Sequence, residues 1–328
     1  MEIKRKKKLS HTAPLIALTL LSILLTQGCA TGRNQRAAIP ITTPSHSDVN
    51  MPGGEPQQPT SEVFGPAGPE PKMTYGPAPV VVKPVVLVLG PGLARGFAYV
   101  GVIRALSEAK IPIGAIVSSE MGSLIGALYA MSTNLNQFEW SLLKFKEEVF
   151  QQPRNFLGRS QPHLSNGETF EAKLREIFHS RNLSESRIPI KMGLRSKKSG
   201  SLMMVNQGNA VKALRAAMAS PRLFSPVLWT HDQANVPTIA VEGQHALLIE
   251  EGRALGLGPV VAVDVLSDTE KKSEREELRG ADLVLRPKMS GISSLDFKKR
   301  TEAAYKGKAA VAEHLEELKH LVGLPPAR

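Results

Sequence analysis

Cysteine, aromatic residues and membrane-spanning apolar runs are all scarce in this 328-residue sequence. The single cysteine, Cys29, excludes a disulfide within the chain. Aromatic side chains make up 5% of the residues, and the short Lys and Arg clusters are not interleaved with them, which argues against nucleic acid as a partner. The apolar run at residues 13–26 is shorter than the roughly 20 residues that a spanning helix needs. With 42% hydrophobic residues, the remaining chain can still bury a sizeable core.

The N-terminus has the composition of an export signal. A basic segment at residues 4–8 precedes the apolar run, which ends shortly before Cys29 and Ala30. This arrangement resembles a bacterial lipoprotein signal, although Thr26 stands where leucine is usual. The resemblance implies a signal peptide at 1–28, a lipid such as palmitate on Cys29, and a lipid anchor in the cell envelope, at the outer membrane facing the periplasm. An ordinary secretory signal remains the alternative.

Residues 29–80 are rich in Pro and Gly and have no apolar periodicity. Runs such as 52–54 and 65–69 cannot sustain a helix or a central strand, so we expect a disordered tether here. The folded domain is therefore expected at 81–328. The net charge of +11 favours anionic lipid head groups as one partner, and a solvated basic surface explains it equally well.

Strand and helix patterns alternate along that domain. The continuous apolar run at 85–89 predicts a strand buried on both faces. Further strands are predicted at 115–118, 188–194, 202–205, 238–241, 260–265 and 283–286, and helices at 97–109, 121–131, 167–178, 210–219, 250–255 and 295–321. This alternation predicts an α/β fold with a mostly parallel central sheet flanked by helices, whose ligands gather at the carboxyl ends of the strands.

Two strand-turn-helix units stand out. In the first, a glycine-rich loop at 89–96 opens a helix, a setting that suits an anion because free N–H groups point at it. In the second, a predicted strand ending at Ser118 turns into a helix rich in small residues, the setting of a nucleophile elbow. The glycine-rich loop alone is weak evidence, because it is also compatible with a simple tight turn, although its glycine spacing does not fit a dinucleotide-binding loop.

Together, the two units and four later segments resemble the patatin-like phospholipase family of serine acyl hydrolases. The later segments are residues 210–227, 239–243, 260–265 and 281–297. The resemblance covers about residues 83–322 and implies the patatin-like acyl-hydrolase fold. It also implies a catalytic Ser-Asp dyad, with the serine in a Gly-x-Ser-x-Gly elbow, and needs no cofactor and no metal.

Both dyad positions hold glutamate in this chain. Glu120 takes the place of the serine, followed by the expected Met121 and Gly122, and Glu242 takes the place of the aspartate, followed by Gly243. Attack by a carboxylate on an ester would give an anhydride with no obvious route forward. If the fold holds, the two carboxylates should face each other, and either one of them stays protonated or a cation or basic group sits between them.

The loop that would form the oxyanion hole is also altered. Gly90, Gly92, Arg95 and Gly96 are retained, but Pro91 and Leu93 stand where glycines are usual. Proline has no N–H to donate, and leucine is poorly suited to a positive φ. Since removing one oxyanion donor costs about 10²–10³ in rate, three altered parts favour loss of hydrolysis.

The sequence leaves three functions open. The first is a non-catalytic lipoprotein that binds a phospholipid, a fatty-acyl ligand or a protein partner. The second is an acyl hydrolase with an altered nucleophile, for which Ser119 and Ser123 are the nearest candidates. The third is a cation site or acid-base chemistry built on the two glutamates, with His231 and His245 in the same region.

Overall fold

The computed structural model describes residues 81–151, 165–231, 234–243, 245–266 and 277–326. The predicted signal peptide, Cys29 and the tether lie outside these residues. Within them, no helix is long and apolar enough to cross a membrane.

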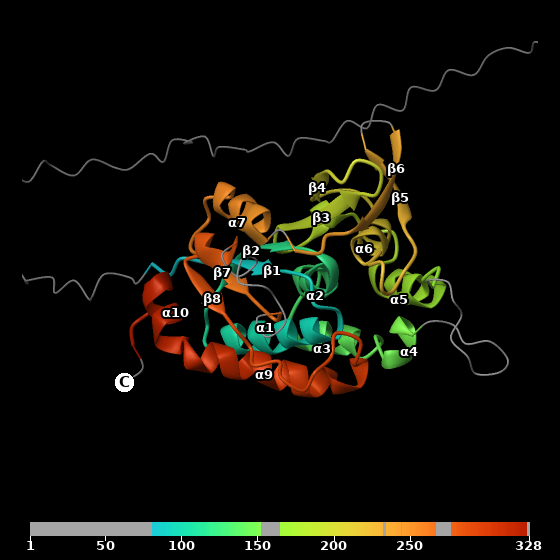
Figure 1. The fold of residues 1–328 in the computed structure, drawn as a ribbon. Helices are drawn as coiled ribbons and strands as arrows, with labels where there is room; N and C mark the ends of the chain where they lie inside the picture. The colour runs from blue at the N-terminus through green and yellow to red at the C-terminus, as the bar shows by residue number, and fades with distance from the viewer. Residues whose placement is uncertain (1–80, 152–164, 232–233, 244, 267–276, 327–328) are drawn as a thin grey trace, which may run out of the picture. The chain divides into compact units, whose positions relative to one another are not determined.

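One mixed, eight-stranded sheet forms the centre of the domain (Figure 1). Seven strands follow the order β5-β6-β3-β2-β1-β7-β8, and β4 pairs with β3 outside this path. The pairs β3-β2, β2-β1, β1-β7 and β7-β8 are parallel, whereas the pairs of β3 with β4, of β3 with β6 and of β5 with β6 are antiparallel. The strands are β1 (Val85–Leu89), β2 (Ile113–Ser118), β3 (Ile190–Ser196), β4 (Leu202–Val205), β5 (Val227–His231), β6 (Ala234–Ala240), β7 (Val260–Val263) and β8 (Leu283–Leu285).

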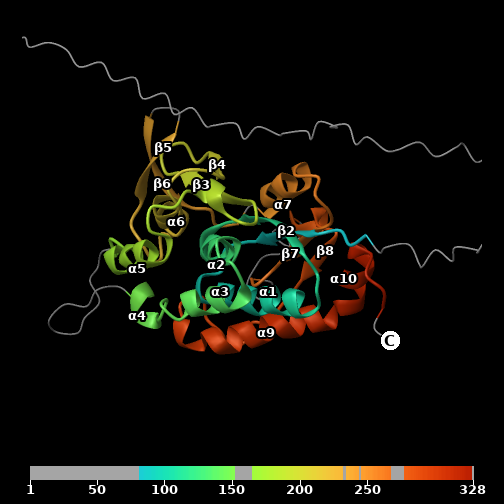
Figure 2. The same ribbon diagram turned by 180° about the vertical axis from the view of Figure 1, so that it is seen from behind.

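Helices cover both faces of the sheet (Figures 1 and 2). α7 packs on one face, while α1, α2 and α9 lie on the other, with α9 outermost. The α-helices are α1 (Ala98–Glu108), α2 (Glu120–Ala130), α3 (Leu135–Leu142), α4 (Glu147–Phe150), α5 (Glu168–Phe178), α6 (Ala210–Ala217), α7 (His245–Ala254), α9 (Arg300–Glu313) and α10 (Leu315–Val322). Short 3-10 turns are η1 (Leu93–Phe97), η2 (Leu183–Glu185), η3 (Glu277–Gly280) and η4 (Phe297–Lys299).

The two faces of strand β1 are both buried, and each packs against a different helix layer. All five of its residues are buried. Leu87 and Leu89 pack into the core shared with α1 and α2, whereas Val86 and Val88 pack into the second core beneath α7. Burying both faces requires a continuous apolar run, which is the pattern predicted from the sequence. The predicted α/β fold with a mostly parallel, helix-flanked sheet is therefore confirmed.

Several local features differ from the sequence prediction, besides shifts of a few residues at strand and helix ends. The single helix expected at 295–321 is the turn η4 followed by two helices, α9 and α10, that meet at His314. The helix expected at 250–255 begins earlier, at His245. The strand β5 and the helices α3 and α4 were not predicted. These elements are short, and α3 and β5 leave Trp140 and Leu228 exposed, so their periodicity is weak.

Candidate functional site

The turn between β2 and α2 places Glu120 at the first position of the helix. Ser119 remains extended, with φ −143° and ψ 157°. Glu120 then adopts φ +46°, in the left-handed region. For a residue other than glycine, such a conformation costs about 1–3 kcal/mol and concentrates at functional sites. The turn has the backbone strain expected of a nucleophile elbow, and it carries the carboxylate of Glu120.

Glycines hold the elbow and the glycine-rich loop together. A Cβ on Gly122 would collide with the backbone carbonyl of Leu89, and a Cβ on Gly96 would collide with the side chain of Met121. The first collision is with main chain, so it could be relieved only by moving α2 away from β1. Gly96, Met121 and Gly122 therefore set how closely the loop and the helix approach each other.

The carboxylate of Glu120 is bound by the glycine-rich loop. Its Oε2 atom accepts hydrogen bonds from the backbone N–H groups of Gly92, at 2.6 Å, and of Leu93, at 2.8 Å. Glu120 is completely buried, and its Oε1 atom has no hydrogen-bond partner in the part of the chain that the structure describes. Two backbone donors that converge on one oxygen are the arrangement of an oxyanion hole. Here the protein's own side chain fills it.

This loop differs from the sequence expectation in one respect. Pro91 contributes no donor, as expected, yet the loop still presents two N–H groups, those of Gly92 and Leu93. Leu93 adopts φ +47° although it is not a glycine. Leucine is poorly suited to a positive φ, and Leu93 adopts one here at the cost of backbone strain. Burial of Leu93 in the core holds it in this strained conformation.

Two side chains fix the loop from outside. The hydroxyl of Tyr99 donates to the carbonyl oxygens of Gly90, at 3.0 Å, and Pro91, at 3.1 Å. Arg95, the retained arginine of the loop, is buried and donates from Nε to the carbonyl of Ile292, at 2.8 Å. Arg95 therefore points towards the segment before α9 rather than towards Glu120. Its role in this structure is to tie the loop to that segment.

Burial raises the pKa of the Glu120 carboxyl above its ordinary value of 4.5. The hydrogen bonds from Gly92 and Leu93 favour the ionised form and oppose this increase, while the negative charge of Glu242 adds to it and Arg222 opposes it. Desolvation is the largest of these effects, so the neutral form of Glu120 is favoured over a wider pH range than in an exposed glutamate.

Glu242 lies beyond the end of β6, close enough to influence Glu120 electrostatically. Its Oε1 accepts a hydrogen bond from the hydroxyl of Ser220, at 2.8 Å, and lies 3.9 Å from Nε of Arg222. Gly243 follows with φ +77°. Glu242 and Arg222 thus both act electrostatically on Glu120, and Arg222 also pairs with Glu242. Sequence reasoning assigned no role to Ser220 or Arg222, although it had singled out their segment, because nothing in the segment shows which side chain faces Glu242.

The other candidates lie around this centre. His245, at the start of α7, is buried, and its Nε2 would lie 2.6 Å from a Cβ on Gly90, so the loop passes over this ring. The side chain of His231 lies outside the described residues. Among those residues, no group of three or more His, Cys, Asp and Glu side chains is arranged to hold a metal ion.

The neighbouring serines do not reach solvent. Ser118, Ser119 and Ser123 are all completely buried. Ser118 donates to Ser123 at 3.2 Å, whereas the hydroxyl of Ser119 has no partner in the described part of the chain. An ester could meet either candidate nucleophile only if the elbow rearranged.

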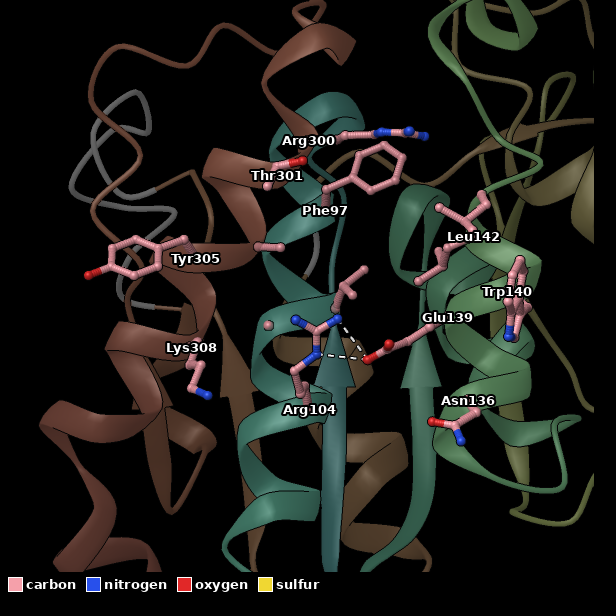
Figure 3. A pocket seen from close by; sticks show the side chains of 14 residues that line it. Phe97, Arg104, Asn136, Glu139, Trp140, Leu142, Arg300, Thr301, Tyr305 and Lys308 are labelled. Carbon is pink, nitrogen blue, oxygen red and sulfur yellow. Dashed lines mark hydrogen bonds and ion pairs between the residues drawn. The ribbon is translucent and has the colours of Figure 1, made fainter.

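A separate groove of about 600 Å³ lies over α1 between α3 and α9 (Figure 3). Neither Glu120 nor Glu242 lines it. Arg104 of α1 and Glu139 of α3 form an ion pair across its floor, with Nη2 and Oε1 2.7 Å apart. The molecule thus has two candidate regions, the closed elbow and this open groove.

Comparison with known proteins identifies relatives of the elbow region. Residues 87–241 match the family model described as patatin-like phospholipase. The chain is 30% identical over 187 residues to a lysophospholipase NTE1 of Coccidioides immitis, covering 56% of this chain and 12% of that protein. It is 28% identical over 191 residues to the rat patatin-like phospholipase domain-containing protein 7, covering 57% of this chain and 14% of the relative. The match therefore spans only a small part of these longer proteins.

A solved structure, VipD from Legionella pneumophila, aligns with a TM-score of 0.37 and 10% identity. That alignment covers 72% of this chain and 67% of that one.

Proposed function

Since this chain belongs to the patatin-like phospholipase family, we propose that it is a non-hydrolytic member of it, a lipid- or protein-binding module anchored to a bacterial membrane through Cys29. The proposal places the anchor in the outer membrane, facing the periplasm. A phospholipid or a fatty-acyl group is the ligand class that the family relationship favours. No cofactor enters the proposal.

One observation supports the proposed loss of hydrolysis. The carboxylate of Glu120 occupies the two N–H donors of Gly92 and Leu93. A hydrolase of this family would need those donors for the developing oxyanion of its substrate, and it would need a nucleophile beside them. With Glu120 in place, the donors are already bound and the nucleophile is absent. An ester carbonyl could enter only after displacing a buried side chain.

The second candidate function is hydrolysis through a shifted serine. The unpartnered hydroxyl of Ser119 is the observation that favours it, because an unpaired buried polar group calls for an explanation. The complete burial of Ser119 counts against this candidate function.

Two measurements on the full chain separate these functions. We expect no turnover of a short-chain fluorogenic ester above that of a Glu120→Ala variant, and no covalent labelling by an alkyl fluorophosphonate. Turnover that Glu120→Ala abolishes would overturn the proposal. Labelling mapped to Ser119 or Ser123, and lost in the matching alanine variant, would establish the shifted-serine hydrolase.

A further inference from the structure

Large apolar side chains stand exposed on both edges of the groove over α1. On the α3 side, Trp140 is 70% exposed and Leu143 52% exposed, and on the α9 side Tyr305 is 74% exposed. Figure 3 shows Trp140 and Tyr305 on opposite edges, with Phe97 at one end between them. Three such residues around one hollow form an exposed apolar patch, a feature that marks an interaction site.

Close helix packing creates the hollow. A Cβ on Gly101 would collide with the carbonyl of Ala304, and a Cβ on Gly307 would collide with the carbonyl of Ala98. The two glycines therefore allow the backbones of α1 and α9 to touch. The side chain of Tyr305 then stands out at the edge. Apart from the Arg104–Glu139 ion pair, the floor is formed by short or buried apolar residues: Phe97, Val100, Gly101, Leu142 and Ala304.

The charges around the hollow are mainly positive. Three cations, Arg104, Arg300 and Lys308, and one carboxylate, Glu139, line it. Arg104 is paired with Glu139, and Lys308 with Glu108 of α1. Arg300 donates to the carbonyl of Phe145 and has no carboxylate partner among the residues that the structure describes.

The positive charge continues along α9. Residues 298–313 contain five Lys or Arg and two Glu. Beyond Tyr305, a second hollow of about 400 Å³ is lined by three more cations, Arg286, Lys288 and Lys306, and by two carboxylates, Glu302 and Glu313. Glu313 pairs with Lys288 and Glu302 with Lys306. The face therefore offers aromatic and aliphatic edges set among charged groups, in which cations outnumber carboxylates.

We propose that this face, formed by the α3 and α9 edges and the groove between them, docks on a bilayer that contains anionic phospholipids. Trp and Tyr rings have an apolar body and a polar tip, which suits the boundary between head groups and acyl chains. Lys and Arg beside them would contact lipid phosphates, each contributing to binding near an anionic surface. The groove would take part of one acyl chain along its apolar floor.

This docking face is distinct from the elbow, and it does not depend on whether hydrolysis is lost or on whether Cys29 carries a lipid. If the wild type proves to hydrolyse esters, the docking proposal is unaffected. If the docking face does not bind vesicles, the proposed loss of hydrolysis is unaffected.

Trp140 provides a site-specific probe, because the chain contains only two tryptophans, Trp140 and Trp229. The full-length Trp229→Phe variant keeps Trp140 as its one fluorophore, and the full-length Trp140→Phe variant keeps Trp229 as the matched control. Each is mixed with vesicles of equimolar phosphatidylcholine and phosphatidylglycerol whose acyl chains carry bromine, a quencher. We expect a blue shift and quenching of Trp140, and neither change for Trp229.

Two further arms test the chemistry of docking. In vesicles of phosphatidylcholine alone, quenching of Trp140 should fall sharply. Replacing Leu143 and Tyr305 with Ser, in the Trp229→Phe background, should raise the vesicle concentration needed for half-maximal quenching about tenfold or more.

The apolar segment at residues 13–26 can bind vesicles by itself, so total binding is measured separately by sedimentation. Chain that sediments with anionic vesicles while Trp140 stays unquenched would overturn the proposal and assign the face to a protein partner. Equal quenching by neutral and anionic vesicles would overturn the charge-based part of the proposal.

Discussion

At the residue scale, Glu120 interacts with two groups that a catalytic serine would need to leave free, the N–H groups of Gly92 and Leu93. A serine side chain is too short to fill an oxyanion hole beside its own backbone, whereas the two extra bonds of a glutamate allow Oε2 to reach both donors. If Glu120 stands where the family has its serine, as we propose, it does more than remove a nucleophile, because its Oε2 already takes up both N–H donors.

The raised pKa of Glu120 predicts a pH dependence of stability. A carboxyl whose pKa is higher in the folded chain than its ordinary 4.5 binds more protons when folded, so its contribution to stability is complete below pH 4.5 and is lost as pH rises through the folded-state pKa. We expect the free energy of unfolding of the wild type, relative to Glu120→Gln, to fall by up to about 1.4 kcal/mol per pH unit across that interval.

Urea denaturation of both proteins in steps from pH 4 upward checks this prediction. The glutamine keeps an oxygen for the two N–H donors and removes the titration. Parallel pH profiles for the two proteins would contradict the raised pKa.

The hydroxyl of Tyr99 supports the loop through two hydrogen bonds. Tyr99→Phe keeps the ring but leaves the carbonyls of Gly90 and Pro91 without these hydrogen bonds. We expect the free energy of unfolding to fall by about 1–3 kcal/mol, the usual cost of leaving buried polar groups unsatisfied. Tyr129→Phe, on a more exposed ring, serves as the control and should change stability less. Equal losses in urea denaturation would show that the Tyr99 hydroxyl has no special role.

At the element scale, glycines in helices determine how the layers approach. Gly101 lies where a Cβ would meet the backbone of Ala304, whereas a Cβ on Gly126, also inside a helix, would lie 3.0 Å from a methyl group of Ile116. A methyl group can shift slightly, but a packed helix backbone cannot do so alone. The arrangement of α1 against α9 therefore depends on one missing methyl group on each helix.

Two matched substitutions test this dependence. Gly101→Ala should destabilise the fold by about 3 kcal/mol or more, since overpacking against a backbone outweighs the gain of up to about 1 kcal/mol in helix propensity. Gly126→Ala should be close to neutral. Thermal unfolding followed by circular dichroism gives both values, and similar effects of the two substitutions would contradict the account of helix packing.

The sequence predicted elements with strong periodicity and missed those without it. The predicted bounds of β1 match the observed ones, and those of α2 differ by one residue at each end. Both predictions succeed because a continuous apolar run and a run of small residues are visible in the local sequence. The antiparallel strand β5 was missed because it is partly exposed and follows a proline-bounded loop. The break between α9 and α10 at His314 was also missed, because no proline or glycine marks it.

The candidate site was predictable in its parts but not in its contacts. The glutamates at positions 120 and 242 and the altered loop are evident in the sequence. The sequence does not show that the Glu120 carboxylate turns into the loop, because this depends on a side-chain rotamer and on the strained φ of Leu93. The partners of Glu242, Ser220 and Arg222, come from a segment about twenty residues away in sequence, and only the fold brings them together.

At the scale of the whole molecule, membrane attachment would come from two separate features, the proposed lipid on Cys29 and the proposed docking face. A single acyl chain gives only marginal membrane binding, so a second contact would strengthen it. We expect metabolic labelling with an alkyne fatty acid to mark the wild-type chain and to be lost in Cys29→Ser. Labelling that persists in Cys29→Ser would rule out that residue as the lipid site.

The most direct test of the central claim is ester hydrolysis by the full-length wild type beside a Glu120→Ser/Glu242→Asp double variant. A Glu120→Ala/Glu242→Asp variant serves as the control, because it also frees the N–H groups of Gly92 and Leu93 but supplies no nucleophile. If Glu120 is what blocks hydrolysis, the wild type and the control are inactive, and the serine variant exceeds both by about 10²-fold or more in kcat/KM. Hydrolysis by the wild type that equals the serine variant and disappears on Glu120→Ala would contradict this expectation.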